Sequence, residues 1–455
     1  MNPEFTRNLW LETTPRRIAW AAVAVAAILF ASAALFGHAG PGGMGRRGPV
    51  EAIGAAGLLI FVVAGLIWGG REAGRAVRIE IGERTWDFQR LSALTPWRMT
   101  WGKLFGATSL AWLTALAGLI AAVPAIWTRL PPDQAVQFVV GALALALLIQ
   151  AGSLAASLVA VRKARAEGRL ATLRGGIGGF FSVIVVLWVI SRGLSLAFVI
   201  ARGGDTAFNG WLRLDPRLWW GVGMSWPTML TASLVAYAAW AVVASWRLMR
   251  LELQMRAIPW AWTTFLVFAA LHLAGFAGSA ARPFALMAGV FAAGAYAAAF
   301  VDPADPVRLR QFAAAARGGD VREAAIHMPL ALPAVALAFL AVVAFAASPT
   351  APFSGASPAF GFAAFAFLAR DLGVIFFFRF GPRPHRGDLG AVLALLVLYM
   401  VGGAVGLIGG ETAGALFHPD PLAPLVGLGS ASAQAAVVWM LAIRRIGGSR
   451  PLLKA

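Results

Sequence analysis

The chain has 455 residues, of which 60% are hydrophobic and 13% charged, and it contains no cysteine. A composition this apolar cannot be arranged around one aqueous core, so it excludes a soluble globular protein and predicts an integral membrane protein. The missing cysteines exclude disulfide bonds and cysteine-ligated metal sites. We interpret the net charge of +18 as a membrane-orientation signal and expect no nucleic-acid partner.

Residues 1–17 precede the first long apolar run. They place Phe5, Trp10 and Leu11 among polar residues, a pattern typical of a helix that lies in the headgroup region of a membrane. We therefore expect a cytoplasmic interfacial helix over residues 1–17, followed by a retained first membrane span.

Long apolar runs recur along the rest of the chain. A hydrocarbon core of ~30 Å requires about 20 apolar residues in a helix, and helices satisfy their own backbone hydrogen bonds in lipid. The sequence predicts an all-α polytopic membrane protein with about twelve transmembrane helices. The predicted spans are Ile18–Phe36, Val50–Gly69, Leu104–Trp127, Ala135–Val161, Ile177–Ile200, Trp226–Trp246, Trp260–Gly278, Pro283–Val301, Leu330–Ser348, Ala359–Phe378, Leu389–Gly409 and Leu422–Ile443.

The orientation of the spans follows from the basic residues. Lys and Arg gather in every second connecting segment, beginning with Arg7, Arg16 and Arg17 ahead of the first span. Because cytoplasmic loops carry an excess of these residues, we predict that the N- and C-termini are both cytoplasmic. The large excess of Arg over Lys is typical of a GC-rich bacterial genome, so we expect a multi-pass protein of the bacterial inner (plasma) membrane.

The order of spans and loops favours two six-helix halves, residues 18–250 and 251–455. In each half, two spans are followed by a long basic loop and then by four more spans. The loop covers residues 70–103 in the first half and 302–328 in the second. Such an arrangement is typical of duplicated transporters. Two unrelated halves remain an alternative, because the loops share little beyond their basic character and a following proline.

The most informative segment lies near residues 79–95, between the second and third spans. Residues 80–92 can form about three helical turns that combine charged side chains with Trp86 and Phe88. Aromatic and arginine residues are the types that dominate protein interfaces. The alternative from the residues alone is a solvated loop whose aromatics touch lipid headgroups.

This segment resembles the coupling helix in the permease subunits of type 2 ATP-binding-cassette exporters. A Glu, a Thr, an apolar and acidic run reaching Leu-Ser-x-Leu-x-Pro, and a Gly-Lys-Leu before the next span carry the resemblance. The matching residues are Glu80, Thr85, Trp86, Asp87, Leu91, Ser92, Leu94, Pro96, Gly102 and Lys103. Arg84 stands where many members have Gly, and twelve spans are more than the usual six.

The resemblance implies a six-span permease unit over residues 18–250, whose coupling helix docks into a cytoplasmic ATPase subunit. It implies docking by Glu80, Glu83, Arg84, Thr85, Trp86, Asp87, Phe88, Arg90 and Leu91. The chain has no G-x-x-x-x-G-K-[ST] phosphate loop. We therefore expect no enzymatic activity and no cofactor in this chain, with ATP and Mg²⁺ bound by the partner. The other expected partners are membrane lipids and a second copy of the chain.

Four charged residues lie inside or beside predicted spans, where burial is costly. Arg192 either faces substrate or marks the end of the fifth predicted span before a short re-entrant helix. We favour the second interpretation. Arg370 and Asp371 are adjacent, so a structural pair or a cytoplasmic boundary is favoured over a site. Glu411 is an outer-loop acid or a gating residue, and we favour the former. The five histidines are dispersed, so we expect no metal site.

The leading hypothesis is thus the transmembrane subunit of an ATP-driven exporter. An ion-coupled secondary transporter is one alternative, with Asp371 as the plausible coupling acid. A polytopic enzyme acting on lipid-linked substrates is the other, although the longest outer loop offers only Asp205 and Asp215 as acids. Lipids, glycans, peptides and drugs all fit an Ala-rich lining equally well.

Overall fold

The structure is a computed structural model that describes residues 2–36, 48–83, 85–91, 94–166, 217–277, 282–348, 357–382 and 386–448. The chain forms two compact units and passes from the first to the second between Met255 and Arg256. Two short segments, 162–169 and 218–222, also belong to the second unit.

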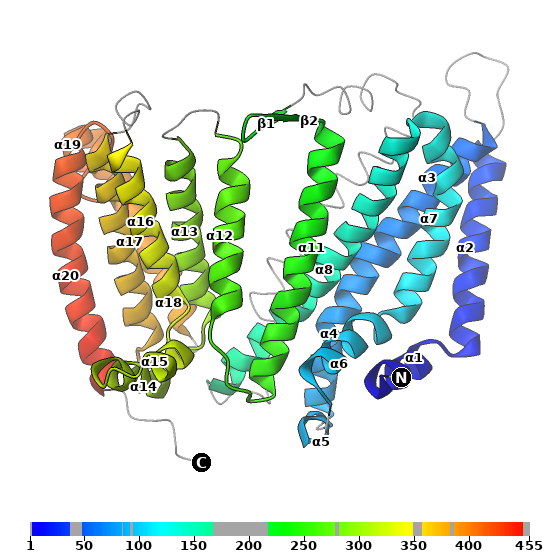
Figure 1. The fold of residues 1–455 in the computed structure, drawn as a ribbon, viewed down its shortest axis with the longest axis horizontal. Coiled ribbons are helices and arrows are strands. Elements are labelled where there is room, and N and C mark those ends of the chain that lie inside the picture. Colours follow the sequence, from blue (N-terminus) through cyan, green and yellow to red (C-terminus); the bar gives the residue numbers. More distant parts are fainter. Residues whose placement is uncertain are drawn as a thin grey trace. The chain divides into compact units, whose positions relative to one another are not determined.

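The first unit is a bundle of long helices with shorter helices at one end (Figure 1). Proline opens several of these helices, where its missing N–H has no partner to lose and its fixed φ suits the first turn. The elements in chain order are α1 (Pro3–Glu12), α2 (Pro15–Phe36), α3 (Pro49–Phe61), η1 (Val62–Trp68), α4 (Gly69–Gly82), α5 (Trp86–Leu91), α6 (Pro96–Trp101), η2 (Gly102–Gly106), α7 (Ser109–Arg129), α8 (Pro132–Ala166) and α11 (Trp226–Glu252). A two-stranded ribbon, β1 (Arg217–Trp219) and β2 (Val222–Met224), precedes α11, and its residues 218–222 are counted with the second unit.

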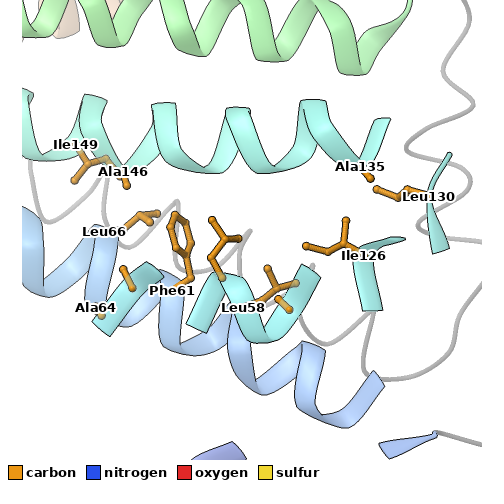
Figure 2. Packing of buried hydrophobic residues seen from close by; sticks show 12 residues of the cluster. Leu58, Phe61, Ala64, Leu66, Ile126, Leu130, Ala135, Ala146 and Ile149 are labelled. Carbon is orange, nitrogen blue, oxygen red and sulfur yellow. The ribbon is translucent and has the colours of Figure 1, made fainter. Parts of the chain in front are cut away.

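Two hydrophobic clusters hold this unit together. The first joins α3, η1, α7 and α8, and Figure 2 shows Leu66 close to Ala146, whereas Leu58 lies on the side of Ile126. The second joins α4, α5, α6, α8 and α11 around buried residues such as Val77, Met99 and Leu154. The second cluster lies at the end of the bundle where the chain turns from α4 into α5, so it supports that turn.

The helix over residues 49–82 contains a π-helical turn. Segment η1 joins α3 to α4 without a break in the helix. A π turn leaves backbone groups without their usual partners, and the buried Gln150 of α8 donates from its side-chain nitrogen to the Gly65 carbonyl at 2.8 Å. A Cβ at Gly69 would lie 2.4 Å from the same nitrogen, so glycine is required there for the amide to reach the turn.

The second unit is also a helical bundle, with α14 and α15 at one end (Figure 1). Its core is built mainly from alanines of α13 and α16, which pack with Leu266 of α12 and with Leu368 and Leu372 of α17. The elements are α12 (Trp260–Ala274), α13 (Arg282–Val301), α14 (Pro306–Arg317), α15 (Val321–His327), α16 (Ala331–Ala347), α17 (Pro358–Arg379), α18 (Gly387–Gly409), α19 (Glu411–Gly414) and α20 (Pro424–Gly448).

Nine helices within the described residues are long and apolar enough to cross a membrane, and α15 with α16 form a bent pair that passes the same test together. Large apolar side chains are exposed along them, for example Leu407 and Ile408, which are 90% and 91% exposed. Such surfaces need lipid around them. The prediction of an all-α polytopic membrane protein is confirmed at this level.

The finer count of twelve spans stays a prediction. Eleven of the predicted ranges coincide with helices, of which α12 is only 15 residues long. The remaining range, Ile177–Ile200, lies outside the described residues.

Candidate functional site

A group of charged and polar side chains around three buried charges lies where α1, α4, α5 and η2 meet, and we call it the Lys103 cluster. Its members are Glu4, Arg7, Glu80, Gln89 and Lys103, which come from distant parts of the sequence. It includes Glu80 of the predicted coupling segment, and for this reason it is the candidate functional site.

Helix α1 is fixed tightly against η2. Asn2 caps α1 by accepting from the Glu4 N–H at 3.2 Å, and its side chain donates to the Arg98 carbonyl of α6 at 2.7 Å. A Cβ at Gly102 would lie 2.5 Å from Cγ of Glu4, and one at Gly106 would lie 2.8 Å from Cβ of Asn8. These two glycines therefore permit an approach that any other residue would block.

Lys103 is the centre of the cluster. Its Nζ lies 2.9 Å from Oε1 of Glu4, and it donates a short hydrogen bond to Oε2 of Glu80 and a longer one, at 3.3 Å, to Oε1 of Gln89. The Lys103 side chain is 1% exposed and the Glu4 side chain 3%. All three donor positions of the ammonium are thus used, and one cation joins η2 to α1, α4 and α5.

Arg7 completes the charge balance. Its guanidinium lies 3.1 Å from Oε1 of Glu4 and forms a short contact with Oε1 of Glu80. The cluster therefore holds two carboxylates and two cations. Burial raises the pKa of the Glu4 carboxyl, but Lys103 and then Arg7 outweigh that effect, and the pKa is lowered. Glu4 is consequently held as an anion.

Trp86 covers the cluster from α5. Its side chain is 2% exposed, and the Lys103 ammonium lies 5.5 Å from the centre of its ring, within range of a cation–π interaction. The indole nitrogen is buried without a hydrogen-bond partner. Trp86 therefore acts as packing for the ion pairs and presents no surface to a partner.

The structure divides the helix that we predicted over residues 80–92. Glu80 lies in the last turn of α4, and the Glu80 carbonyl accepts from both the backbone N–H and the hydroxyl of Thr85, which closes that helix. Helix α5 then begins at Trp86. The reason is tertiary: Glu80 is held by Lys103 and Arg7, and the chain must turn to place Trp86 over them.

The other predicted docking residues surround this turn. Glu83 is exposed at the end of α4, and Thr85 and Arg90 are half-buried. Arg84 lies outside the described residues, as do the side chains of Asp87, Phe88 and Leu91. Of the predicted set, Glu80 and Trp86 thus face inward, and Glu83 faces outward.

Arg370 and Asp371 form a separate buried network in α17 of the second unit. Nε of Arg370 lies 2.8 Å from Oδ1 of Asp371, and both side chains are almost fully buried, at 1% and 2% exposed. The hydroxyls of Tyr296 in α13 and Tyr399 in α18 each donate to Oδ2 of Asp371 at 2.7 Å. Arg370 also donates to the Phe417 carbonyl at 2.8 Å. The structure thus brings the predicted pair together with two tyrosines from other helices.

The two remaining predicted residues lie elsewhere. Arg192 is outside the described residues, and Glu411 is exposed at the start of α19. Among the residues that the structure describes, no three His, Cys, Asp or Glu side chains are grouped closely enough to hold a metal ion.

Sequence reasoning missed Glu4, Arg7 and Gln89 as partners of Glu80, and Tyr296 and Tyr399 as partners of Asp371. A usable signal was the rarity of lysine, because Lys103 is one of only three in the chain and lies between Gly102 and Gly106. No family model, curated protein or solved structure matches this chain.

Proposed function

We propose that this chain is the transmembrane subunit of an ATP-driven exporter, coupled to a separate cytoplasmic ATPase subunit that binds ATP and Mg²⁺. The proposal includes twelve spans, both termini in the cytoplasm, a bacterial inner membrane and pairing of two chains through their first halves. The observation that supports it best is the Lys103 cluster, which ties the predicted docking segment to the membrane helices by buried charges.

The cluster has the properties of a mechanical link. Helix α4 continues through η1 into α3, a run of helix from Pro49 to Gly82. A force on α5 reaches Lys103 through the buried Trp86, and from Lys103 it reaches α4 and η2 together. Because close-packed groups shift as blocks and do not deform continuously, these elements would move as one piece.

The Asp371 network bears on the secondary-transporter alternative. An ion-coupled carrier needs a membrane acid that can bind a cation or a proton. Both oxygens of Asp371 are already occupied, one by Arg370 and the other by the two tyrosine hydroxyls. A carboxylate whose acceptor positions are filled in this way fits a structural role, which favours the ATP-driven exporter.

The decisive experiment is purification of the tagged chain in mild detergent, with identification and ATPase assay of the proteins that accompany it. The wild type should retain a cassette ATPase. The charge reversal Glu83→Arg changes an exposed side chain beside α5, and it should lower ATPase recovery by about tenfold or more, because like charges at an interface cost several kcal/mol.

The matched control is Glu411→Arg, the same substitution at an exposed acid that we place on the outer side. It should leave the complex intact. Equal loss with both variants would contradict docking at the α4–α5 turn. A wild-type chain that purifies without any ATPase would contradict the exporter proposal and favour a carrier or a membrane enzyme.

A further inference from the structure

A groove separates α2 from the rest of the first unit. Its volume is about 840 Å³, within the range of ~300–1,000 Å³ that is typical of ligand sites. One wall is a single face of α2, formed by Ala21, Ala24, Val25 and Ile28, and the opposite wall includes Leu59 of α3 and Val63 of η1. Both walls are apolar.

The groove exists because α2 is attached at its two ends. Near its start, Arg17 donates to the Leu11 carbonyl of α1 at 3.2 Å. Near its other end, the Ser32 hydroxyl donates to the Ala52 carbonyl of α3 at 2.6 Å. No residue of α2 is buried, and Trp20 is 74% exposed. A helix that packs so little against protein, in a chain this apolar, has lipid as its main neighbour.

The dimensions of the groove match one leaflet. It runs along α2 from Arg17 to Ile28, which at a rise of ~1.5 Å per residue amounts to about 16 Å. Half of a hydrocarbon core of ~30 Å is about 15 Å. An acyl chain lying in the groove would therefore extend from one membrane surface to the middle of the bilayer.

Four charged side chains line the end of the groove near α1. They form two ion pairs, Glu12 with Arg17 at 2.9 Å and Glu72 with Arg75 at 3.4 Å. All four are at least one-fifth exposed. Burial raises the pKa of Glu12, Arg17 opposes that rise and Glu72 adds to it, so the two pairs interact across the opening. This end of the groove thus carries two positive and two negative groups.

We propose that this groove binds one phospholipid whose headgroup is zwitterionic and carries a primary ammonium, as in phosphatidylethanolamine. The lipid phosphate lies between Arg17 and Arg75, because guanidinium groups match phosphate oxygens in charge and geometry. The ammonium lies against Glu12 and Glu72, and one acyl chain follows α2. An anionic lipid is disfavoured, because its headgroup has no cation to satisfy the two carboxylates. The site does not depend on the transport function proposed above.

The test uses the full chain, purified in detergent and titrated with phosphatidylethanolamine or phosphatidylglycerol, with bound lipid counted by native mass spectrometry. The wild type should retain one phosphatidylethanolamine and prefer it over phosphatidylglycerol. Arg75→Gln, at a half-exposed position, should weaken phosphatidylethanolamine binding by about fivefold, the effect of losing one charge contact of roughly 1 kcal/mol.

A matched pair of variants tests the apolar wall. Ala24→Trp fills the groove and should abolish retention of the lipid, whereas Ala26→Trp lies on the same helix, is exposed and does not line the groove, so it should behave as the wild type. Equal retention of phosphatidylethanolamine by both tryptophan variants would overturn the proposal that the lipid binds in this groove. Equal or tighter binding of phosphatidylglycerol by the wild type would overturn the headgroup assignment.

Discussion

Replacing Lys103 by Met tests whether the Lys103 cluster holds α1 and the α4–α5 turn in place. The substitution keeps an unbranched side chain, one atom shorter, and removes its charge. It leaves Arg7, whose side chain is 42% exposed, as the only cation of the cluster beside the carboxylates of Glu4 and Glu80. Removing one partner of a buried ion pair costs about 3–5 kcal/mol. We expect a loss of that size in the free energy of unfolding, because Lys103 itself is almost completely buried.

The measurement is reversible unfolding in mixed micelles, followed by circular dichroism, for Lys103→Met, Glu80→Gln and the double variant. If the residues act as a pair, the double variant should recover about 1–3 kcal/mol of the summed losses, since coupled neighbours are not additive. A loss below about 1 kcal/mol for Lys103→Met, or strictly additive losses, would refute the view that these charges bind the four elements together.

Four other substitutions probe the Lys103 cluster and the network around Asp371. Gly102→Ala should lower the free energy of unfolding by about 1–3 kcal/mol and expose α1 to proteolysis, because its Cβ would lie 2.5 Å from Cγ of Glu4. The control is Gly152→Ala, whose Cβ meets nothing within 4 Å. It should change neither the stability nor the proteolysis of α1. Glu4 has a lowered pKa in the folded protein, so its contribution to stability is complete above the ordinary value of 4.5 and is lost as pH falls toward the folded pKa. Glu4→Gln should therefore be less stable than the wild type near neutral pH, and the difference in the free energy of unfolding should disappear in acid. A difference that persists in acid would contradict the assignment of Glu4 as an anion. Asp371→Asn should lower the free energy of unfolding by about 3–5 kcal/mol, because it leaves Arg370 buried without its counter-charge. Tyr399→Phe removes one hydrogen bond and should lower it by about 1 kcal/mol. Equal losses for the two variants in the micelle assay would argue against an ion pair as the main interaction.

The long helices could be predicted because hydropathy alone determines which segments enter lipid. Their ends could not. The third span was predicted from Leu104, whereas α7 begins at Ser109. Residues Gly102–Gly106 belong to η2, which packs against α1. That packing depends on a partner about a hundred residues earlier in the chain, which no local pattern shows.

The contacts of the candidate site could not be predicted from local patterns either. Trp86 has the composition of an interface anchor, and in the structure it is buried over Lys103. An aromatic residue can serve as an exposed interface anchor or as buried packing over a cation, and only the position of the cation in the fold distinguishes the two roles. In the second unit, adjacency predicted that Arg370 and Asp371 would pair. The tyrosines come from 75 residues before Asp371 and 28 residues after it, and only the folded bundle brings them together.

The π-helical turn η1 makes this region depend on residue number more than on residue identity. A π turn holds one residue more than an α turn. Deleting one residue from Val62–Trp68 would let this stretch close as a regular α-helix and leave Gly69–Gly82 near its present rotation, whereas inserting one residue would rotate Gly69–Gly82 by roughly 100° about its axis. After the insertion Glu80 would leave Lys103, and after the deletion Gln150 would lose the carbonyl to which it donates. Apolar residues of η1 should thus be exchangeable for one another, whereas a single insertion should disconnect the α4–α5 turn from the bundle.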